Sequence, residues 1–423
     1  MNILKGIFKN KPLLNLFTYG VGQGFNLITP ILVTPYLTGT CGQSGLGKIG
    51  VSMALSFILI VIIDYGSDII GVKNVAVNRD NSKELSKILS TAFACRFLLL
   101  IMVVIAMSLL YIFVPYLSKE KELYILALPI LLGQCISPTW VFQGLENFKA
   151  ITVITIISKI IYMAGVFYFV KSEPDYIYVN LFWGIGMMLP NSVAFIYLCT
   201  KKNISLKNTS VKEVSGFLKG YFTMFSSQLF MSLQLYVPIM LVKFFLGDSM
   251  AGTYRIIDQV VVIFKTYIFL FFNYVYPRVC YLLEKNMKEA MRFWKIYNAA
   301  NFAFVATCML VLFAMAKTVV SYFTDQAVTN EIVTEMMGLL RVAVFIPLAM
   351  AVSIPLKQLV LGKDYQQFYI KLTTIMVAVN IVLMAVLLPY FKIYGVLVSL
   401  IVTEVVTALF YATVIKIKPS TVN

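Results

Sequence analysis

The chain contains no histidine in 423 residues. This absence excludes imidazole metal sites and catalytic triads that use histidine as a base. Its six cysteines stand singly and form no CxxC pair, so packing is their expected role. We therefore expect a protein with no metal site and no cofactor.

Charge is also scarce, and acidic residues are scarcer than basic ones. Only 13% of the residues are charged, with 19 Asp and Glu against 35 Lys and Arg. Hydrophobic residues make up 60% of the chain, whereas soluble domains have roughly 45–50% apolar residues. The composition predicts an all-α integral membrane protein that lies in the lipid bilayer.

Long apolar runs recur along the whole chain. A helix that crosses a bilayer needs about 20 residues, and by this measure we count about twelve spans. They cover residues 13–37, 49–70, 88–114, 123–145, 151–170, 176–199, 217–245, 251–275, 296–320, 333–361, 367–390 and 393–415.

The basic residues give the orientation. Lys and Arg favour the cytoplasmic side of a membrane, and most of those in the loops fall on one side if both termini are cytoplasmic. Because these residues are spread over many short loops, they indicate topology and attraction to anionic lipid headgroups rather than nucleic-acid binding.

A polar stretch near the middle of the chain divides the spans into two groups of about six. Shifting the sequence by about 205 residues places Gln23 on Gln228 and Gly47 on Gly252, and many transporters consist of duplicated halves. We expect an N-terminal lobe at 1–200, a cytoplasmic linker at 201–216 and a C-terminal lobe at 217–423.

Several charged residues lie inside the predicted spans. Each costs roughly 2.5 kcal/mol or more at the centre of a helix, so such residues usually face a bundle interior or a watery cavity. Some of these charges near the interfaces could instead reach lipid headgroups. The charged residues are Arg96, Lys159, Arg255, Lys265, Arg341, Lys357, Asp64, Asp68, Asp258 and Glu404.

Spacing relates some of these residues to one another. Arg255, Asp258 and Lys265 share one helical stripe, and Asp64 and Asp68 share one helical face. Asp258 could be a coupling site or could simply neutralise Arg255, whereas Glu404 has no partner in its own helix and is the acid least easily explained as structural.

Uncharged polar residues mark one side of the first span, where Gln23 and Asn26 precede two prolines, Pro30 and Pro35. Prolines inside a span leave carbonyl groups that water or neighbouring residues must satisfy. A polar helix face beside a cavity is one interpretation, and small polar residues that hold helices together are the other. The excess of cations favours an anionic ligand with a lipid or sugar part.

Motifs in the first half resemble bacterial O-antigen and polysaccharide flippases of the Wzx type. These flippases belong to the MOP superfamily, which also contains multidrug and toxin extrusion transporters and lipid II flippases. The segments that carry the resemblance are Tyr19-Gly20-Val21-Gly22-Gln23-Gly24-Phe25-Asn26, Thr29-Pro30, Pro35-Tyr36-Leu37, Asp64-Tyr65-Gly66 and Pro138-Thr139-Trp140-Val141-Phe142-Gln143-Gly144-Leu145-Glu146.

The resemblance implies a protein of the bacterial inner membrane that moves an undecaprenyl-diphosphate-linked oligosaccharide, an O-antigen or capsule repeat unit, from the cytoplasmic to the periplasmic leaflet. It implies alternating access, coupling to H⁺ or Na⁺ antiport, and contact with the polysaccharide polymerase machinery. The implied cavity residues are Arg96, Lys159, Arg255, Lys265, Arg341, Gln23 and Asn26, and the implied ion-coupling residues are Glu404, Asp64 and Asp258.

Two other functions are alternatives to a flippase. A multidrug exporter of the same superfamily would share the fold, but cationic drugs favour an acidic cavity, and the intramembrane charges here are mostly basic. A membrane glycosyltransferase or polysaccharide polymerase usually carries a large catalytic loop, and this chain has no comparable loop. We therefore expect a transporter and not an enzyme.

Overall fold

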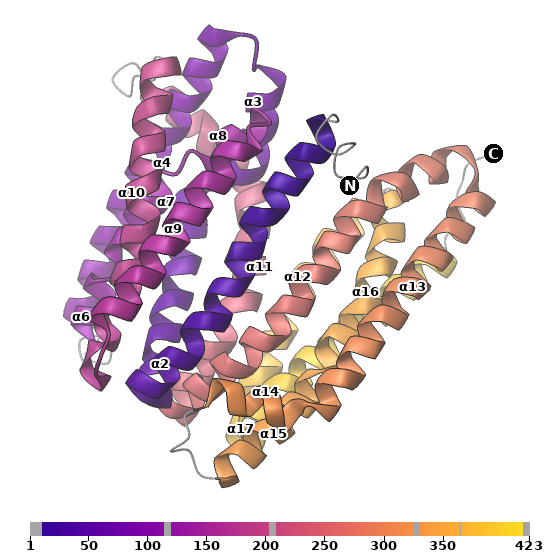
Figure 1. Ribbon diagram of the computed structural model, residues 1–423. Coiled ribbons are helices and arrows are strands. Elements are labelled where there is room, and N and C mark those ends of the chain that lie inside the picture. The colour runs from indigo at the N-terminus through magenta and orange to yellow at the C-terminus, as the bar shows by residue number, and fades with distance from the viewer. Residues whose placement is uncertain (1–10, 114–119, 203–208, 325–329, 364, 418–423) are drawn as a thin grey trace, which may run out of the picture. The chain divides into compact units, whose positions relative to one another are not determined.

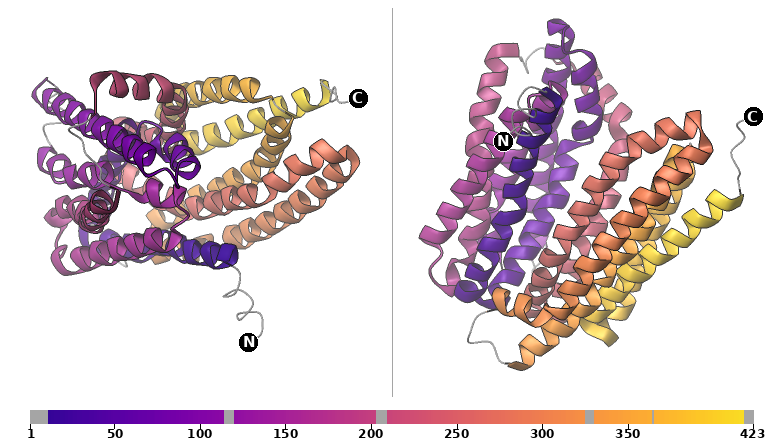
Figure 2. Two further views of the ribbon diagram at one scale, coloured as in Figure 1. Left: turned by 90° about the horizontal axis from the view of Figure 1, so that it is seen from above. Right: turned by 45° about the vertical axis from the view of Figure 1, so that its right-hand side comes forward.

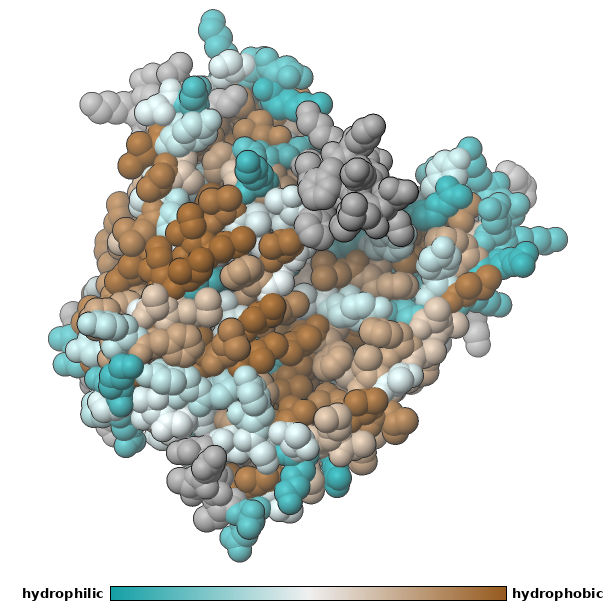
Figure 3. Space-filling view, in the orientation of Figure 1, coloured by the Kyte–Doolittle hydropathy of each residue, from teal (hydrophilic) through white to brown (hydrophobic). Residues whose placement is uncertain are grey.

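The computed structural model describes residues 11–113, 120–202, 209–324, 330–363 and 365–417. Within these ranges the regular structure is helical throughout and contains no strand. The predicted all-α class is therefore confirmed. Figure 1 shows the long helices, and in Figure 3 hydrophobic side chains cover most of their middle parts while hydrophilic ones gather toward their ends.

The chain forms two compact units, Met1–Tyr236 and Val237–Asn423. The boundary between them falls inside one helix, α11 (Val211–Leu246). The expected linker at 201–216 stays a prediction, because residues 203–208 lie outside the described part of the chain.

In the first unit, α9 packs against both α2 and α10, and α10 also packs against α7. In order, the elements before α11 are α2 (Lys11–Asp64), the π-helix η1 (Ser67–Gly71), α3 (Val72–Val77), α4 (Ser82–Phe113), α6 (Lys121–Ile125), α7 (Leu128–Cys135), α8 (Thr139–Gly144), α9 (Phe148–Phe169), the 3₁₀ helix η2 (Glu173–Tyr176) and α10 (Ile177–Lys202).

In the second unit, α16 packs against α12, α13 and α17, and these helices run alongside one another in the right-hand view of Figure 2. The elements after α11 are α12 (Asp248–Lys285), α13 (Met287–Ala314), α14 (Ala316–Phe323), α15 (Asn330–Ala343), α16 (Phe345–Gly362) and α17 (Gln366–Ile417).

Among the described residues, ten helical segments are long and apolar enough to cross a membrane. Two of them are interrupted by a residue with non-helical backbone angles, Gly42 in α2 and Lys392 in α17. The first segment covers most of predicted spans 13–37 and 49–70, and the second covers 367–390 and 393–415, so every predicted span has a helical counterpart. Predicted span 49–70 runs past the end of α2 at Asp64 and across a break in the helix. At Gly42 the φ of 67° and ψ of 177° suit a glycine, which lacks the Cβ that would make these angles costly.

A sharp break separates α2 from η1 and positions two acidic residues. Tyr65 and Gly66 both have positive φ, 44° and 78°, and the Gly66 carbonyl then accepts hydrogen bonds from the N–H groups of Ile69 and Ile70. As a result Asp64 ends α2, while Asp68 lies in the π-helix that follows.

The motif glycine of the fourth span allows a close helix contact. A Cβ on Gly144 would lie 2.8 Å from the Val72 carbonyl oxygen and 2.7 Å from a Val75 methyl group, so α8 can approach α3 only because residue 144 has no side chain. Gly71 likewise leaves room for the ring of Trp140, which packs in a buried cluster with Phe93 and Leu89.

Candidate functional site

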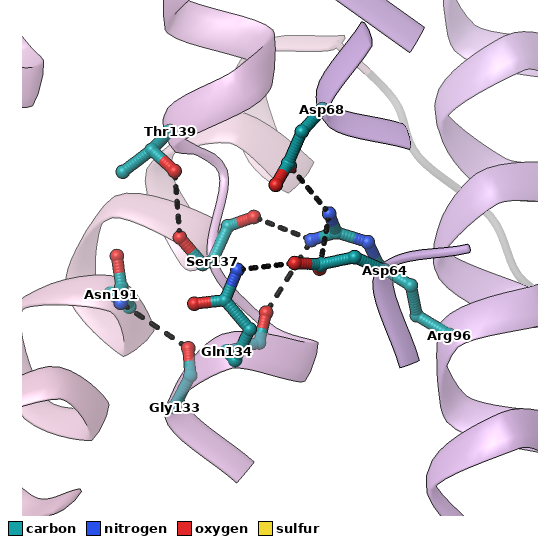
Figure 4. A network of polar contacts seen from close by, with 8 residues as sticks. All are labelled: Asp64, Asp68, Arg96, Gly133, Gln134, Ser137, Thr139 and Asn191. Carbon is teal, nitrogen blue, oxygen red and sulfur yellow. Dashed lines mark hydrogen bonds and ion pairs between the residues drawn. The ribbon is translucent and has the colours of Figure 1, made fainter. Parts of the chain in front are cut away.

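The first unit contains a buried ionic network centred on Arg96. The side chain of Arg96 in α4 is 1% exposed, and its Nη2 lies 2.7 Å from Oδ1 of Asp64, whose side chain is 5% exposed. The same nitrogen lies 3.4 Å from Oδ1 of Asp68. Figure 4 shows the guanidinium between these two carboxylates. They meet at Arg96 although they do not share the helical face that their spacing predicts, because α2 ends at Asp64 and the break at Tyr65 and Gly66 follows.

The remaining contacts of the network come from the fourth predicted span. Nη1 of Arg96 donates to the carbonyl oxygens of Ser137 and Gln134, at 3.0 and 3.4 Å, and Nε2 of Gln134 donates to Oδ2 of Asp64 at 2.8 Å. The guanidinium also lies over the ring of Trp140, 5.4 Å from its centroid. Arg96 thus joins α2, η1, α4 and the segment between α7 and α8.

This geometry indicates what the network can do chemically. The guanidinium is directed toward protein acceptors, and its charge is matched by a buried carboxylate, so it is well suited to hold four elements together. The side chain of Asp68 is 44% exposed, and one of its carboxylate oxygens lies 3.4 Å from Nη2 of Arg96. Arg96 thus fixes the position of a carboxylate that stays accessible.

Lys159 is the other buried cation of the first unit. It lies in α9 and is 8% exposed, and its Nζ sits 3.6 Å from the centroid of the Trp183 ring. Phe57 and Tyr162 pack edge-on against the same ring. Within the described part of the chain Lys159 forms no ion pair, so its charge is stabilised by an aromatic face alone.

Gln23 and Asn26 form a pair on the polar side of α2. Nδ2 of Asn26 donates to Oε1 of Gln23 at 3.3 Å. Gln23 also lines a cavity of 270 Å³ between α2, η1, α8 and α9, and Asp68 faces the same cavity. The structure therefore places Gln23 and Asp68 beside the same cavity. Their spacing along the sequence does not indicate this.

In the second unit, Asp258 forms an ion pair with Lys265, with 3.0 Å between Oδ1 and Nζ. The sequence analysis named Arg255, the nearer cation, as the residue that Asp258 could neutralise, whereas the cation in this pair is Lys265. Both cations lie on the same stripe of α12, and the long flexible side chain of Lys265 reaches back along the helix to the carboxylate.

Glu404 in α17 is held by a residue of another helix. Its Oε2 accepts a hydrogen bond of 2.6 Å from Oγ of Ser353 in α16. Lys357 lies over the rings of Tyr369 and Phe272. The structure thus joins Asp258 to Lys265 within α12, and Glu404 to Ser353 between α17 and α16.

Two predicted residues of the second unit remain, one in α15 and one in α12. Arg341 in α15 donates from Nε to the Phe313 carbonyl at 3.4 Å and lies over the Phe313 ring. Arg255 is half-buried in α12. Among the described residues no group of three or more Cys, Asp or Glu is arranged to hold a metal ion.

The residues of these networks that were not predicted as site residues include Asp68, Gln134, Trp183 and Ser353. Asp68 lies near the end of its predicted span, where a charged residue can reach lipid headgroups. Gln134 is a polar side chain inside a predicted span, and that signal could have identified it. The contacts of Trp183 and Ser353 join different helices, so no local pattern indicates them.

The chain is similar to two bacterial proteins over nearly its whole length. It is 22% identical to a protein of Escherichia coli (strain K12) over 92% of this chain and 93% of that protein, and 23% identical to one of Shigella dysenteriae over 95% and 99%. Each relative is named "Putative O-antigen transporter".

Solved structures share the fold. An inward-facing multidrug resistance MATE family transporter of the MOP superfamily matches with a TM-score of 0.74 at 14% identity, covering 93% of this chain and 94% of that one. The lipid II flippase MurJ, in an inward closed conformation, matches with a TM-score of 0.75 at 16% identity, covering 94% and 87%. The expected MOP-type fold is confirmed.

A family model described as "Polysaccharide biosynthesis protein" matches residues 13–283, which include all of the first unit's described helices and the start of the second unit. Together with the named relatives, this match confirms the resemblance to polysaccharide transporters and places the chain among multi-pass membrane transporters rather than in an enzyme family. The chain belongs to this polysaccharide biosynthesis protein family.

Proposed function

We propose that this protein is a flippase that moves an undecaprenyl-diphosphate-linked oligosaccharide repeat unit from the cytoplasmic to the periplasmic leaflet by alternating access. The observation that carries the proposal is the similarity over nearly the full length to two relatives named as O-antigen transporters. The substrate would be an O-antigen or capsule repeat unit, and the protein would act in the inner membrane beside the polysaccharide polymerase machinery.

The intramembrane cations support an anionic substrate. Lys159 is buried and makes no ion pair among the described residues, so a diphosphate would supply the counter-charge that the protein itself does not. Lys and Arg bind phosphate strongly. Arg96 differs from Lys159, because its guanidinium is directed toward carboxylates and carbonyls of the protein.

A deletion strain of the source bacterium tests the function directly. Loss of the gene should abolish surface polysaccharide and leave lipid-linked repeat units on the cytoplasmic leaflet, and the cloned gene should restore export. Normal surface polysaccharide in the deletion strain, with increased sensitivity to cationic drugs, would instead indicate the multidrug exporter.

The topology can be checked separately. We propose that both termini are cytoplasmic, so a reporter that is active only outside the cytoplasm should be active when fused after Lys171 and silent when fused after Lys207. Lys207 lies outside the described residues, and its assignment depends on the basic loop in the sequence. Reporter activity after Lys207 would overturn the proposed orientation.

Removing single cations should separate their roles. Changing Lys159, Lys265 or Arg341 to Gln should reduce surface polysaccharide while the protein stays in the membrane, with the largest effect at Lys159. Arg341→Lys should restore less than full export wherever bidentate contacts matter. The measurements are polysaccharide gels and immunoblots of membranes, and normal export from all three Gln variants would reject the cavity assignment.

A further inference from the structure

The cavity between α2, η1, α8 and α9 has a chemistry that differs from that of the buried cations. Its volume is about 270 Å³, and most of the residues that line it carry polar side chains, namely Gln23, Asp68, Thr139, Gln143 and Thr155. Trp140 and Ile151 supply its apolar wall. Among the described residues that line it there is no lysine or arginine. We call it the η1 pocket.

Asp68 gives the η1 pocket an acidic group of fixed position. One of its oxygens lies 3.4 Å from Nη2 of Arg96, and Arg96 is held in turn by Asp64 and two carbonyl oxygens. A carboxylate repels phosphate, but it accepts strong charge-assisted hydrogen bonds from hydroxyl groups. The pocket therefore favours hydroxyl donors over the diphosphate.

The other polar groups complement this acceptor. The Oε1 of Gln23 already accepts a hydrogen bond from Asn26. The NH₂ group of Gln23 therefore remains available as a donor. Thr155 donates its hydroxyl to the Ile151 carbonyl at 2.9 Å, so its oxygen remains able to accept. Acceptors and donors thus surround one space, which matches a ring that carries several hydroxyl groups.

The pocket has room for one sugar ring. Pockets that hold drug-sized molecules have about 300 Å³ or more, and the volume here is about 270 Å³. In the proposed topology, η1 and α8 adjoin the loops that face the cytoplasm, where the lipid-linked glycan is assembled. A sugar ring would meet the pocket before transport.

We propose that the η1 pocket binds one uncharged, hydroxyl-bearing sugar ring of the lipid-linked glycan and so selects the glycan by its sugar, apart from the cations that hold the diphosphate. This inference rests on the proposed flippase function for its role in transport. The binding itself depends only on the groups that line the pocket and can be measured without transport.

Saturation-transfer NMR on the purified full-length protein tests the binding. The probes are methyl glycosides of glucose, galactose, mannose and N-acetylglucosamine, with inorganic pyrophosphate as a competitor. We expect at least one glycoside to bind, its deoxy analogues to bind about fivefold or more weakly, and pyrophosphate not to displace it. Absence of binding by every glycoside, or displacement by pyrophosphate, would overturn the proposal.

Two variants locate the binding at the pocket. Gln143→Ala and Thr155→Val should each lower the affinity for the glycoside about fivefold, as expected for loss of one hydrogen bond. The controls are Gln367→Ala, another exposed glutamine, and Thr374→Val, whose hydroxyl also donates to the carbonyl four residues earlier. Equal binding by the pocket variants and their controls would place the sugar elsewhere and reject the assignment.

An export measurement then separates this inference from the proposed function. The double variant of Gln143→Ala and Thr155→Val should export its native polysaccharide less than the double control does, with equal amounts of protein in the membrane. If the wild-type protein exports no polysaccharide, the flippase function fails while the binding result stands. If the wild type and the double pocket variant export equally, only the sugar-selecting role fails.

Discussion

Replacing Arg96 with Gln should lower the free energy of unfolding by about 3–5 kcal/mol, the loss found when one partner of a buried ion pair is removed. The physical reason is that Asp64, with a side chain 5% exposed, would keep a buried carboxylate without its cation. Heating the purified protein and measuring the folded fraction by size-exclusion chromatography will show the loss as a lower unfolding temperature.

The structure offers a matched control and a rescue for this substitution. Arg79 is 51% exposed and lies 3.8 to 3.9 Å from its carboxylates, so Arg79→Gln should change stability by about 1 kcal/mol or less. Adding Asp64→Asn to Arg96→Gln should recover part of the loss, because no unpaired buried charge then remains. An Arg96→Gln protein as stable as the wild type would show that the network does not stabilise the fold.

The second large effect is expected at Glu404. Glu404→Gln should abolish the dependence of transport on an imposed proton gradient, because a glutamine retains the oxygen that accepts from Ser353 but cannot exchange a proton. The measurement is uptake of lipid-linked repeat units by inverted vesicles with and without the gradient. Ser353→Ala serves as the control, since it removes the hydrogen bond and leaves the carboxyl group in place.

Asp258 should behave differently from Glu404. Asp258→Asn leaves Lys265 without the carboxylate that lies 3.0 Å away, so we expect lower protein yield but retained dependence on the gradient. A Glu404→Gln protein with the wild-type rate and unchanged pH dependence would make Glu404 a structural residue. Dependence on sodium in place of protons would require a site where several oxygens converge.

The fold could be predicted from the sequence because the signal is local. Each span is a largely apolar run of the length that a bilayer requires, and the breaks inside α2 and α17 fall in the gaps between predicted spans, at Gly42 and Lys392. The break at Tyr65 and Gly66 lies inside a predicted span instead, so the helical face that spacing assigns to Asp64 and Asp68 does not form.

The networks could be predicted only in part because their partners come from different helices. Arg96 was identified as a buried charge, but its contacts with Asp64 and the Ser137 carbonyl depend on how α4 packs against other elements. Asp258 shows that even a partner within the same helix cannot always be predicted from the sequence. Two cations share its stripe, and the reach of the Lys265 side chain, which spacing does not encode, determines the ion pair.

The pairing of Arg96 with Asp64 also bears on how the chain enters the membrane. An arginine at the centre of a span costs roughly 2.5–3.5 kcal/mol during insertion by the translocon. Asp64 and Asp68 precede Arg96 in the sequence, so during synthesis both acidic residues have left the ribosome before α4 is inserted. The second and third spans can therefore enter the lipid as a hairpin in which Asp64 already neutralises Arg96, and Gln134 joins later, when the fourth span arrives.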